Sequence, residues 1–229
     1  MLYWDPTYMI ILPGLIFAMI AQSMVQSAFR RGQQRRSRNG FFGEAAARRF
    51  LAMHGVFDVK IESAHGKLGD HYDPTTKTLR LSKEVRYSDS VAAISVACHE
   101  AGHALQHAEG YGPLKLRTAA VPSVNIGSNL AWPVFIAGLI FSWQPLVEAG
   151  IWLFALTVLF ALITLPVEFN ASRRALAGMA ESGILFPDEQ PAAKSVLNAA
   201  AMTYVASAVT AILQLLRLLA IAGVGRRRD

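Results

Sequence analysis

Four long runs of apolar residues dominate the hydropathy pattern of the chain. They cover residues 8–25, 121–143, 150–167 and 196–224. A helix needs about 20 apolar residues to cross the hydrocarbon core of a bilayer, and all four runs are close to that length or exceed it. The pattern therefore predicts a mainly α-helical membrane protein with about four transmembrane helices.

Shorter patterns between the first and second runs indicate a small α+β region with a short sheet. Residues 42–53 repeat their apolar side chains at helical spacing, and residues 56–62 alternate apolar and polar side chains as a half-buried strand does. A second short strand is expected at residues 78–81, after a turn. Residues 87–90 are suited to cap a further helix at 91–107.

The composition supports the membrane assignment and removes one function class. Hydrophobic residues make up 53% of the 229 residues, and the mean hydropathy of +0.32 is high for a soluble domain. The net charge of +6 could suggest nucleic acid. The arginines, however, lie beside apolar runs and no nucleic-acid-binding motif is found, so we expect no nucleic-acid partner. A single cysteine, Cys98, excludes an internal disulfide framework and a Cys-rich zinc site.

Arginines beside the apolar runs predict the orientation of the chain in the membrane. Five arginines follow the first run, within residues 30–38, and Arg173 and Arg174 follow the third. Because basic flanks stay in the cytoplasm, the N-terminus is expected outside and both basic segments inside. The fourth run conflicts with this rule, since it would place the arginines at 226–228 outside. It would also bury Arg217 within the span, at a cost of roughly a few kcal/mol unless it is paired or snorkels.

These observations divide the chain into membrane and cytoplasmic parts. A glycine and two prolines within residues 180–194 predict a loop there. The expected parts are an N-terminal transmembrane helix at 1–29, a cytoplasmic region with the capped helix at 30–118, a transmembrane hairpin at 119–167, a second cytoplasmic segment at 168–195 and a C-terminal apolar helix at 196–229.

The expected helix at residues 91–107 carries the candidate chemistry. It contains His99-Glu100-Ala101-Gly102-His103, an H-E-x-x-H pattern. Side chains four positions apart lie on one helical face, so His99 and His103 can bind one metal ion together. Glu100 can then reach a water on that metal, where a general base is needed. The pattern predicts a zinc-dependent hydrolytic site, and two histidines buried in a core are the alternative.

A catalytic zinc ion takes three protein ligands and keeps one position open for water, so a third ligand is needed. His107 lies about 12 Å from His99 along an unbroken helix, too far for both to bind one ion unless the helix bends. A metzincin arrangement is excluded, because Gln106 and Glu109 stand where it needs a glycine and a histidine.

Glu168 is the better candidate for the third ligand. It stands at the inner end of the third apolar run, where a carboxylate is costly to bury unless it binds something. An ion pair with Arg173, Arg174 or a lipid headgroup is the alternative. We therefore predict a site of two histidines and one glutamate.

Several blocks of the sequence resemble the YugP-like neutral zinc metallopeptidases of bacterial membranes. The blocks are Asp70-His71-Tyr72-Asp73-Pro74, Leu79-Arg80-Leu81-Ser82, the H-E-x-x-H motif with residues 105–111, and residues 165–174. The resemblance covers nearly the whole chain. It implies a multi-span gluzincin-type peptidase of the bacterial inner membrane, with a small zincin-like catalytic region facing the cytoplasm. It also implies that His99, His103 and Glu168 bind Zn²⁺ and that Glu100 is the catalytic base.

The chain is similar, more distantly, to the HtpX and CAAX prenyl protease group. In that group an aspartate four residues after the glutamate ligand supports a histidine ligand, whereas this chain has Ser172 at that position. We therefore expect the supporting contact to come from Ser172, Asn170 or a residue elsewhere.

These features together predict an integral membrane endopeptidase that uses zinc-activated water on membrane or damaged proteins at the cytoplasmic face. Its expected partners are a peptide or protein substrate and the lipid bilayer. His71 and Tyr72 are candidates for an oxyanion donor, and the edge of their strand could bind an extended peptide. Two alternatives stay open: an intramembrane-type metalloprotease, and a non-catalytic membrane scaffold with a zinc site.

Overall fold

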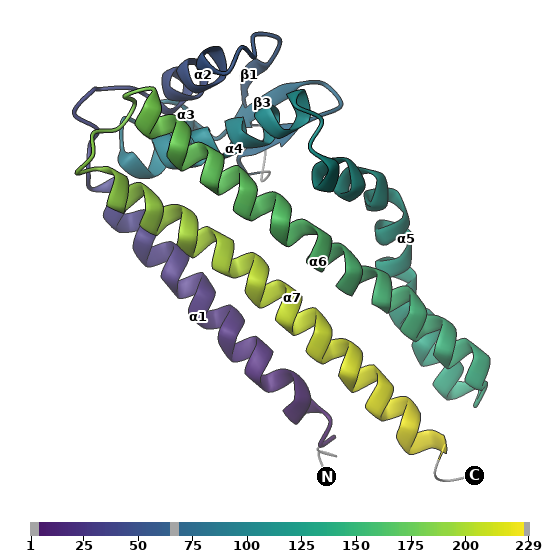
Figure 1. Ribbon diagram of the computed structural model, residues 1–229. Helices are drawn as coiled ribbons and strands as arrows, with labels where there is room; N and C mark the ends of the chain where they lie inside the picture. Colours follow the sequence, from purple (N-terminus) through teal and green to yellow (C-terminus); the bar gives the residue numbers. More distant parts are fainter. Residues whose placement is uncertain (1–4, 65–68, 227–229) are drawn as a thin grey trace. The chain divides into compact units, whose positions relative to one another are not determined.

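The structure is a computed structural model that describes residues 5–64 and 69–226. The chain folds into two compact units. The first, here the helical unit, comprises Met1–Ala21, Leu116–Leu165 and Thr203–Asp229. The second, here the motif unit, comprises Gln22–Lys115 and Pro166–Met202. The described residues form seven helices and one three-stranded sheet (Figure 1).

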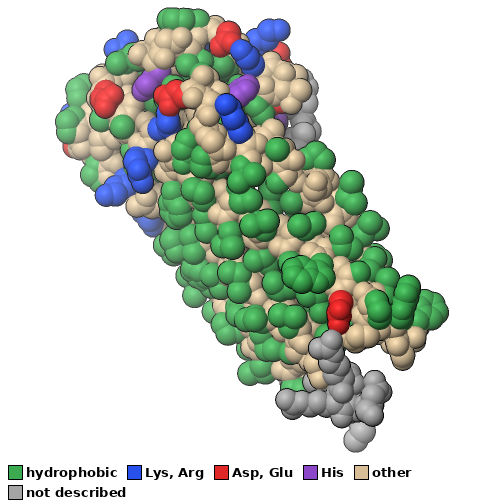
Figure 2. All heavy atoms as spheres, turned by 45° about the vertical axis from the view of Figure 1, so that its right-hand side comes forward, with side chains coloured by type: hydrophobic (Ala, Val, Ile, Leu, Met, Phe, Trp, Pro, Cys, Tyr) green, Lys and Arg blue, Asp and Glu red, His purple; other side chains and the backbone are tan. Residues whose placement is uncertain are grey.

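Four helices are long and apolar enough to cross a membrane. They are α1 (Tyr8–Gln33), α5 (Gly112–Ile140), α6 (Gln144–Glu181) and α7 (Gln190–Arg226). Figure 2 shows hydrophobic side chains covering the face of the long helices, as expected for surfaces in contact with lipid. The prediction of a mainly helical protein with about four spans is confirmed.

Close helix packing holds the helical unit together. A Cβ atom added to Gly150 on α6 would lie 2.7 Å from the backbone of Phe135 on α5, so only glycine permits this approach. On the other side of the unit, Gly14 of α1 packs against Leu213 and Thr210 of α7. Small residues at such contacts let helix backbones approach closely, which is how helices associate in lipid.

Arg217, whose burial conflicted with a fourth span, is paired within the helical unit. Its guanidinium lies 3.2 Å from a carboxylate oxygen of Asp5 and donates to the Thr7 hydroxyl at 3.0 Å. It also lies 3.8 Å above the ring of Tyr8. The pairing offsets the cost of burying Arg217, so α7 is compatible with a span. The other part of the conflict, the arginine side chains at 226–228, lies outside the described residues.

The motif unit contains the sheet and the short helices α2 (Gly43–Met53), α3 (Lys83–Arg86) and α4 (Val91–Ala108). The strand order is β1 (Lys60–Ser63), β3 (Thr78–Leu81), β2 (His71–Asp73), with β1 parallel and β2 antiparallel to β3. β2 therefore lies at one edge of the sheet, and its Tyr72 pairs with Leu79 of β3. α2 and α4 enclose an apolar core with the sheet and the inner parts of α6 and α7. Its largest fully buried members are Phe50, Leu79, Leu81, Ile94, Met179, Ile184 and Leu197.

Two predicted boundaries are wrong. The strand expected at residues 56–62 is reduced to β1, Lys60–Ser63, because pairing with β3 begins only at Lys60, while the Val56 backbone N–H donates to the Leu51 carbonyl of α2 at 2.9 Å. The loop expected at residues 180–194 is shorter, since α6 continues to Glu181 and α7 begins at Gln190. Pro191 misled the prediction: proline is tolerated in the first turn of a helix, where its missing N–H would have no partner.

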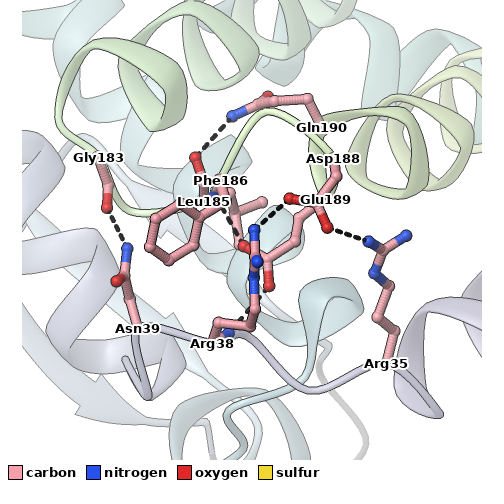
Figure 3. A network of polar contacts seen from close by, with 9 residues as sticks. All are labelled: Arg35, Arg38, Asn39, Gly183, Leu185, Phe186, Asp188, Glu189 and Gln190. Carbon is pink, nitrogen blue, oxygen red and sulfur yellow. Dashed lines mark hydrogen bonds and ion pairs between the residues drawn. The ribbon is translucent and has the colours of Figure 1, made fainter.

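A polar network fastens the segment after α1 to the loop between α6 and α7 (Figure 3). The buried Glu189 carboxylate accepts hydrogen bonds from the backbone N–H groups of Arg38 at 2.9 Å and Phe186 at 2.7 Å. Asp188, on the surface, pairs with Arg35 and Arg38. The network holds the loop between α6 and α7 against the segment after α1 within the motif unit.

Glu189 should therefore matter to stability far more than its neighbour. Glu189→Ala leaves two backbone donors without their acceptor, at about 1–3 kcal/mol each, so the thermal midpoint in detergent should fall by at least about 5 °C. Asp188→Ala removes only exposed ion pairs and should shift the midpoint by less than about 2 °C. Equal shifts for the two variants would contradict the role assigned to the Glu189 carboxylate.

Candidate metal centre

Helix α4 presents the two histidines of the H-E-x-x-H motif on one face. The helix begins at Ser90, whose side chain accepts a hydrogen bond from the backbone N–H of Ala93 at 3.2 Å. This confirms the predicted cap. One turn apart near the other end of the helix, the rings of His99 and His103 lie edge to face with their centroids 4.9 Å apart.

Helix α6 brings Glu168 to both imidazoles. One carboxylate oxygen of Glu168 lies 3.2 Å from Nε2 of His99 and 3.5 Å from Nε2 of His103. The three candidate ligand atoms all lie within 4.8 Å of one another. In a tetrahedral zinc site with bonds of about 2.0–2.2 Å, ligand atoms are separated by about 3.3–3.6 Å. Both Glu168 distances are close to this range, so the residues fit the metal that their chemistry implies.

Gly102 allows α4 to approach α6 this closely. A Cβ atom at position 102 would lie 2.8 Å from the carbonyl oxygen of Ala171, and a carbonyl on a helix cannot move aside freely. Glycine within a helix generally weakens it, but here the missing Cβ atom has a structural use. In the structure Gly102 is the point of contact that brings the Glu168 turn of α6 against the two histidines.

Two neutral side chains orient the imidazoles. The Ser172 hydroxyl lies 3.1 Å from Nδ1 of His99, and the Gln106 side-chain carbonyl lies 3.0 Å from Nδ1 of His103. When each Nδ1–H donates to its partner, each Nε2 keeps the lone pair that a metal requires. Of the candidates left open by the sequence, Ser172 is the one that lies against His99.

Gln106 is the functional residue that sequence reasoning missed. It is fully buried, and its amide nitrogen donates to the Val167 carbonyl at 2.8 Å and to the Asn170 side chain at 2.9 Å. It thus ties His103 on α4 to the turn of α6 that carries Glu168. The available signal was a glutamine one turn after His103, on the same side of an otherwise apolar helix.

Gln106→Leu should weaken zinc binding without unfolding the protein. The substitution keeps the volume but removes the acceptor that fixes His103, and loss of such a support typically costs 10–100-fold in metal affinity. Competition with a chromophoric chelator would measure the affinity. Gln34→Leu, at an exposed glutamine, is the matched control. An affinity within twofold of the control would show that His103 does not depend on Gln106.

Glu100 stands beside the two imidazoles and contacts the sheet. One of its carboxylate oxygens accepts a hydrogen bond from the backbone N–H of Tyr72 at 3.1 Å. Burial raises the pKa of the Glu100 carboxyl, although the neighbouring His103 and His99 act in the opposite direction. A raised pKa suits a group that must both take and return a proton near neutral pH.

The other residues considered in the sequence analysis, His107, His71 and Arg174, each contact a different group. His107 is outside the cluster of candidate ligands among the described residues, and its Nδ1 lies 2.9 Å from the Tyr72 hydroxyl. His71 contacts the Gly69 carbonyl at 2.9 Å. Arg174, considered as a partner of Glu168, pairs with Glu109 at 2.7 Å.

Comparisons with known proteins agree with this geometry. The model of a family described as "Putative neutral zinc metallopeptidase" matches residues 7–223. The chain is 45% identical over 206 residues to a Bacillus subtilis (strain 168) protein named "Putative membrane protease YugP", covering 90% of this chain and 92% of that protein. No solved structure matches the chain.

Proposed function

The chain belongs to the neutral zinc metallopeptidase family, and from this premise we propose that it is an integral membrane endopeptidase that hydrolyses peptide bonds with metal-activated water. One observation carries the proposal: His99, His103 and Glu168 converge from two helices, with Glu100 held beside them. Damaged or membrane-embedded proteins are the proposed substrates.

Each of the three donor residues has a defined part in this proposal. His99 and His103 would bind zinc through Nε2 and Glu168 through a carboxylate oxygen, a donor set of the gluzincin type. When bound, zinc polarises the peptide carbonyl and lowers the pKa of a coordinated water toward neutrality. Ser172 and Gln106 hold the imidazoles in the tautomer that this binding needs.

Glu100 moves the proton. Its carboxylate accepts a proton from the attacking water and returns it to the leaving amine, which departs as a neutral group. The Tyr72 backbone N–H fixes one of the two carboxylate oxygens. Because the two oxygens belong to one rigid carboxylate group, this hydrogen bond also fixes the position of the second oxygen. The base therefore keeps one orientation during the reaction.

The two alternative functions fit less well. An intramembrane protease would carry its motif within a span, but α4 is not among the candidate spans of the described chain. A scaffold with a structural zinc site would normally use four protein ligands, whereas the described His, Cys, Asp and Glu side chains supply a cluster of three. A catalytic site with an open position is the better account.

The proposal is tested with the purified full-length chain in detergent. We expect it to cleave casein, to lose this activity on treatment with a chelator and to regain it with stoichiometric zinc. A preparation that binds zinc tightly yet cleaves no unfolded protein would favour the scaffold.

The active site is proposed to face the cytoplasm of a bacterial inner membrane. In this arrangement residues 30–118 and 168–195 lie inside, residues 1–29, 119–167 and 196–229 belong to the membrane part, and the turn between α5 and α6 lies outside. The arginines of residues 30–38 support this orientation.

Cysteine labelling tests the orientation. In a Cys98→Ala background, we expect Lys60→Cys to react with a membrane-impermeant maleimide only after the cells are opened, and Ser142→Cys to react in intact cells. Both positions are exposed. The labelling therefore reports the side of the membrane on which each residue lies, and not its burial within the protein. The reverse labelling pattern would place the site on the outer face.

A further inference from the structure

A cavity of about 240 Å³ opens in the motif unit against α4, directly after the H-E-x-x-H motif. Its apolar surface comes from Val56 and Val59, which precede β1, and from Ala104 and Ala108 on α4. The volume is enough for one side chain and below the roughly 300–1,000 Å³ of sites that bind whole small molecules.

Part of the cavity lining is polar. The hydroxyl of Tyr72 and the imidazole of His107 line it, 2.9 Å apart at the hydroxyl oxygen and Nδ1. Desolvation raises the pKa of Tyr72 to about 12, so the phenol keeps its proton. Among the described residues the printed hydrogen bond of His107 uses Nδ1, which leaves its Nε2 to a bound group.

The acidic and the basic side chain that line the cavity are paired. Asp58 and Lys77, the two charged residues that line it, form an ion pair with each other. An acidic or basic side chain entering the cavity would lose hydration without gaining an unpaired opposite charge. A purely apolar side chain would leave the Tyr72–His107 pair without the partners that water provides. The lining therefore favours a side chain that is uncharged and hydrogen-bonding.

The cavity is close enough to Glu100 for a peptide cleaved there to place one of its side chains in the cavity. Ala104 and Ala108 follow Glu100 by one and two helical turns on the same face, and each turn advances about 5.4 Å. An extended peptide advances about 3.3 Å per residue. A side chain in the cavity therefore belongs to a residue about two to three positions from the bond that Glu100 serves. Tyr72 connects the two places, since its backbone N–H binds Glu100 and its phenol lines the cavity.

We propose that this cavity is the substrate side-chain pocket, and that it selects an uncharged residue with a hydrogen-bonding end, such as glutamine or tyrosine, close to the cleaved bond. The assignment rests on the proposed peptidase function, because it needs a peptide bound beside Glu100. Tyr72 and His107 determine the chemical preference, and Ala108 limits the size of the side chain.

The experiment uses the zinc-loaded full-length chain. Cleavage sites in casein are mapped by mass spectrometry, and a peptide around one site is then made with glutamine, methionine, glutamate, lysine or glycine at each of the three positions on either side. We expect one position at which glutamine is cleaved about tenfold faster than methionine, its near-isostere, and faster than either charged residue.

Two variants test which residues are responsible. Tyr72→Phe keeps the backbone contact to Glu100 and should bring the glutamine-to-methionine ratio to about one; the ratio between peptides, and not the absolute rate, is the readout. Ala108→Leu fills the cavity and should slow long side chains about tenfold or more while sparing glycine. Ala52→Leu, at an exposed alanine on α2, is the control for a bulkier helix residue.

Retained cleavage with unchanged ratios in both variants would overturn the pocket assignment and leave the peptidase function standing. Absence of cleavage by the zinc-loaded wild-type chain would instead overturn the proposed function, and the pocket with it.

Discussion

The Glu100→Gln variant should bind zinc like the wild type and hydrolyse peptides about 10²–10⁴-fold more slowly, the range that a positioned general base contributes. Glutamine keeps the size of the side chain and can still accept the hydrogen bond from the Tyr72 backbone N–H. It cannot take a proton from water. The loss should therefore appear in kcat, with little change in KM or thermal stability.

Metal content and peptidase activity must be measured on the same preparation for this comparison. Glu109→Gln is the matched control, because Glu109 lies just beyond α4 and pairs with Arg174 at the surface of the unit. Full activity in the Glu100→Gln variant would remove Glu100 from the mechanism and point to another base.

The second large effect is expected at Glu168. Glu168→Ala removes the one proposed ligand that α6 supplies, so zinc affinity should fall by more than about 100-fold, beyond what loss of a supporting residue costs. Activity should be undetectable at stoichiometric zinc. His107→Ala, by contrast, should leave the metal bound, because His107 lies outside the cluster of candidate ligands and contacts Tyr72.

Both variants are titrated with zinc and then with a competing chelator. This distinguishes a site whose third ligand is Glu168 from one whose third ligand is His107. Loss of zinc in His107→Ala with retention in Glu168→Ala would mean that the helix delivers all three ligands by itself. The contact of α4 with α6 through Gly102 would then have no part in metal binding.

The sequence predicted the parts of the site that are encoded by local spacing. His99 and His103 lie four positions apart, and on a helix this spacing alone brings the two rings together. Glu168 could be inferred because a carboxylate at the end of an apolar run needs a partner. The cap of α4 at Ser90 was likewise readable from a few neighbouring residues.

Contacts between distant segments could not be predicted in this way. The role of Gln106 depends on Val167 and Asn170, which are 61 and 64 residues away. The parallel pairing of β1 with β3 and the contact of Tyr72 with Glu100 also follow from packing that no local pattern specifies. The start of α7 was mispredicted because proline usually ends a helix. Pro191 is tolerated because it lies in the first turn of α7, which a local pattern does not reveal.

The division of the proposed ligands between α4 and α6 has a consequence for biosynthesis. His99 and Glu168 are 69 residues apart in the chain, and a ribosome adds about 5–20 residues each second. His99 is therefore made roughly 3–14 s before Glu168. During that time the nascent chain cannot assemble the three-ligand centre. The order of the proposed ligands along the polypeptide thus delays completion of the candidate metal centre until the turn of α6 that carries Glu168 has been synthesised.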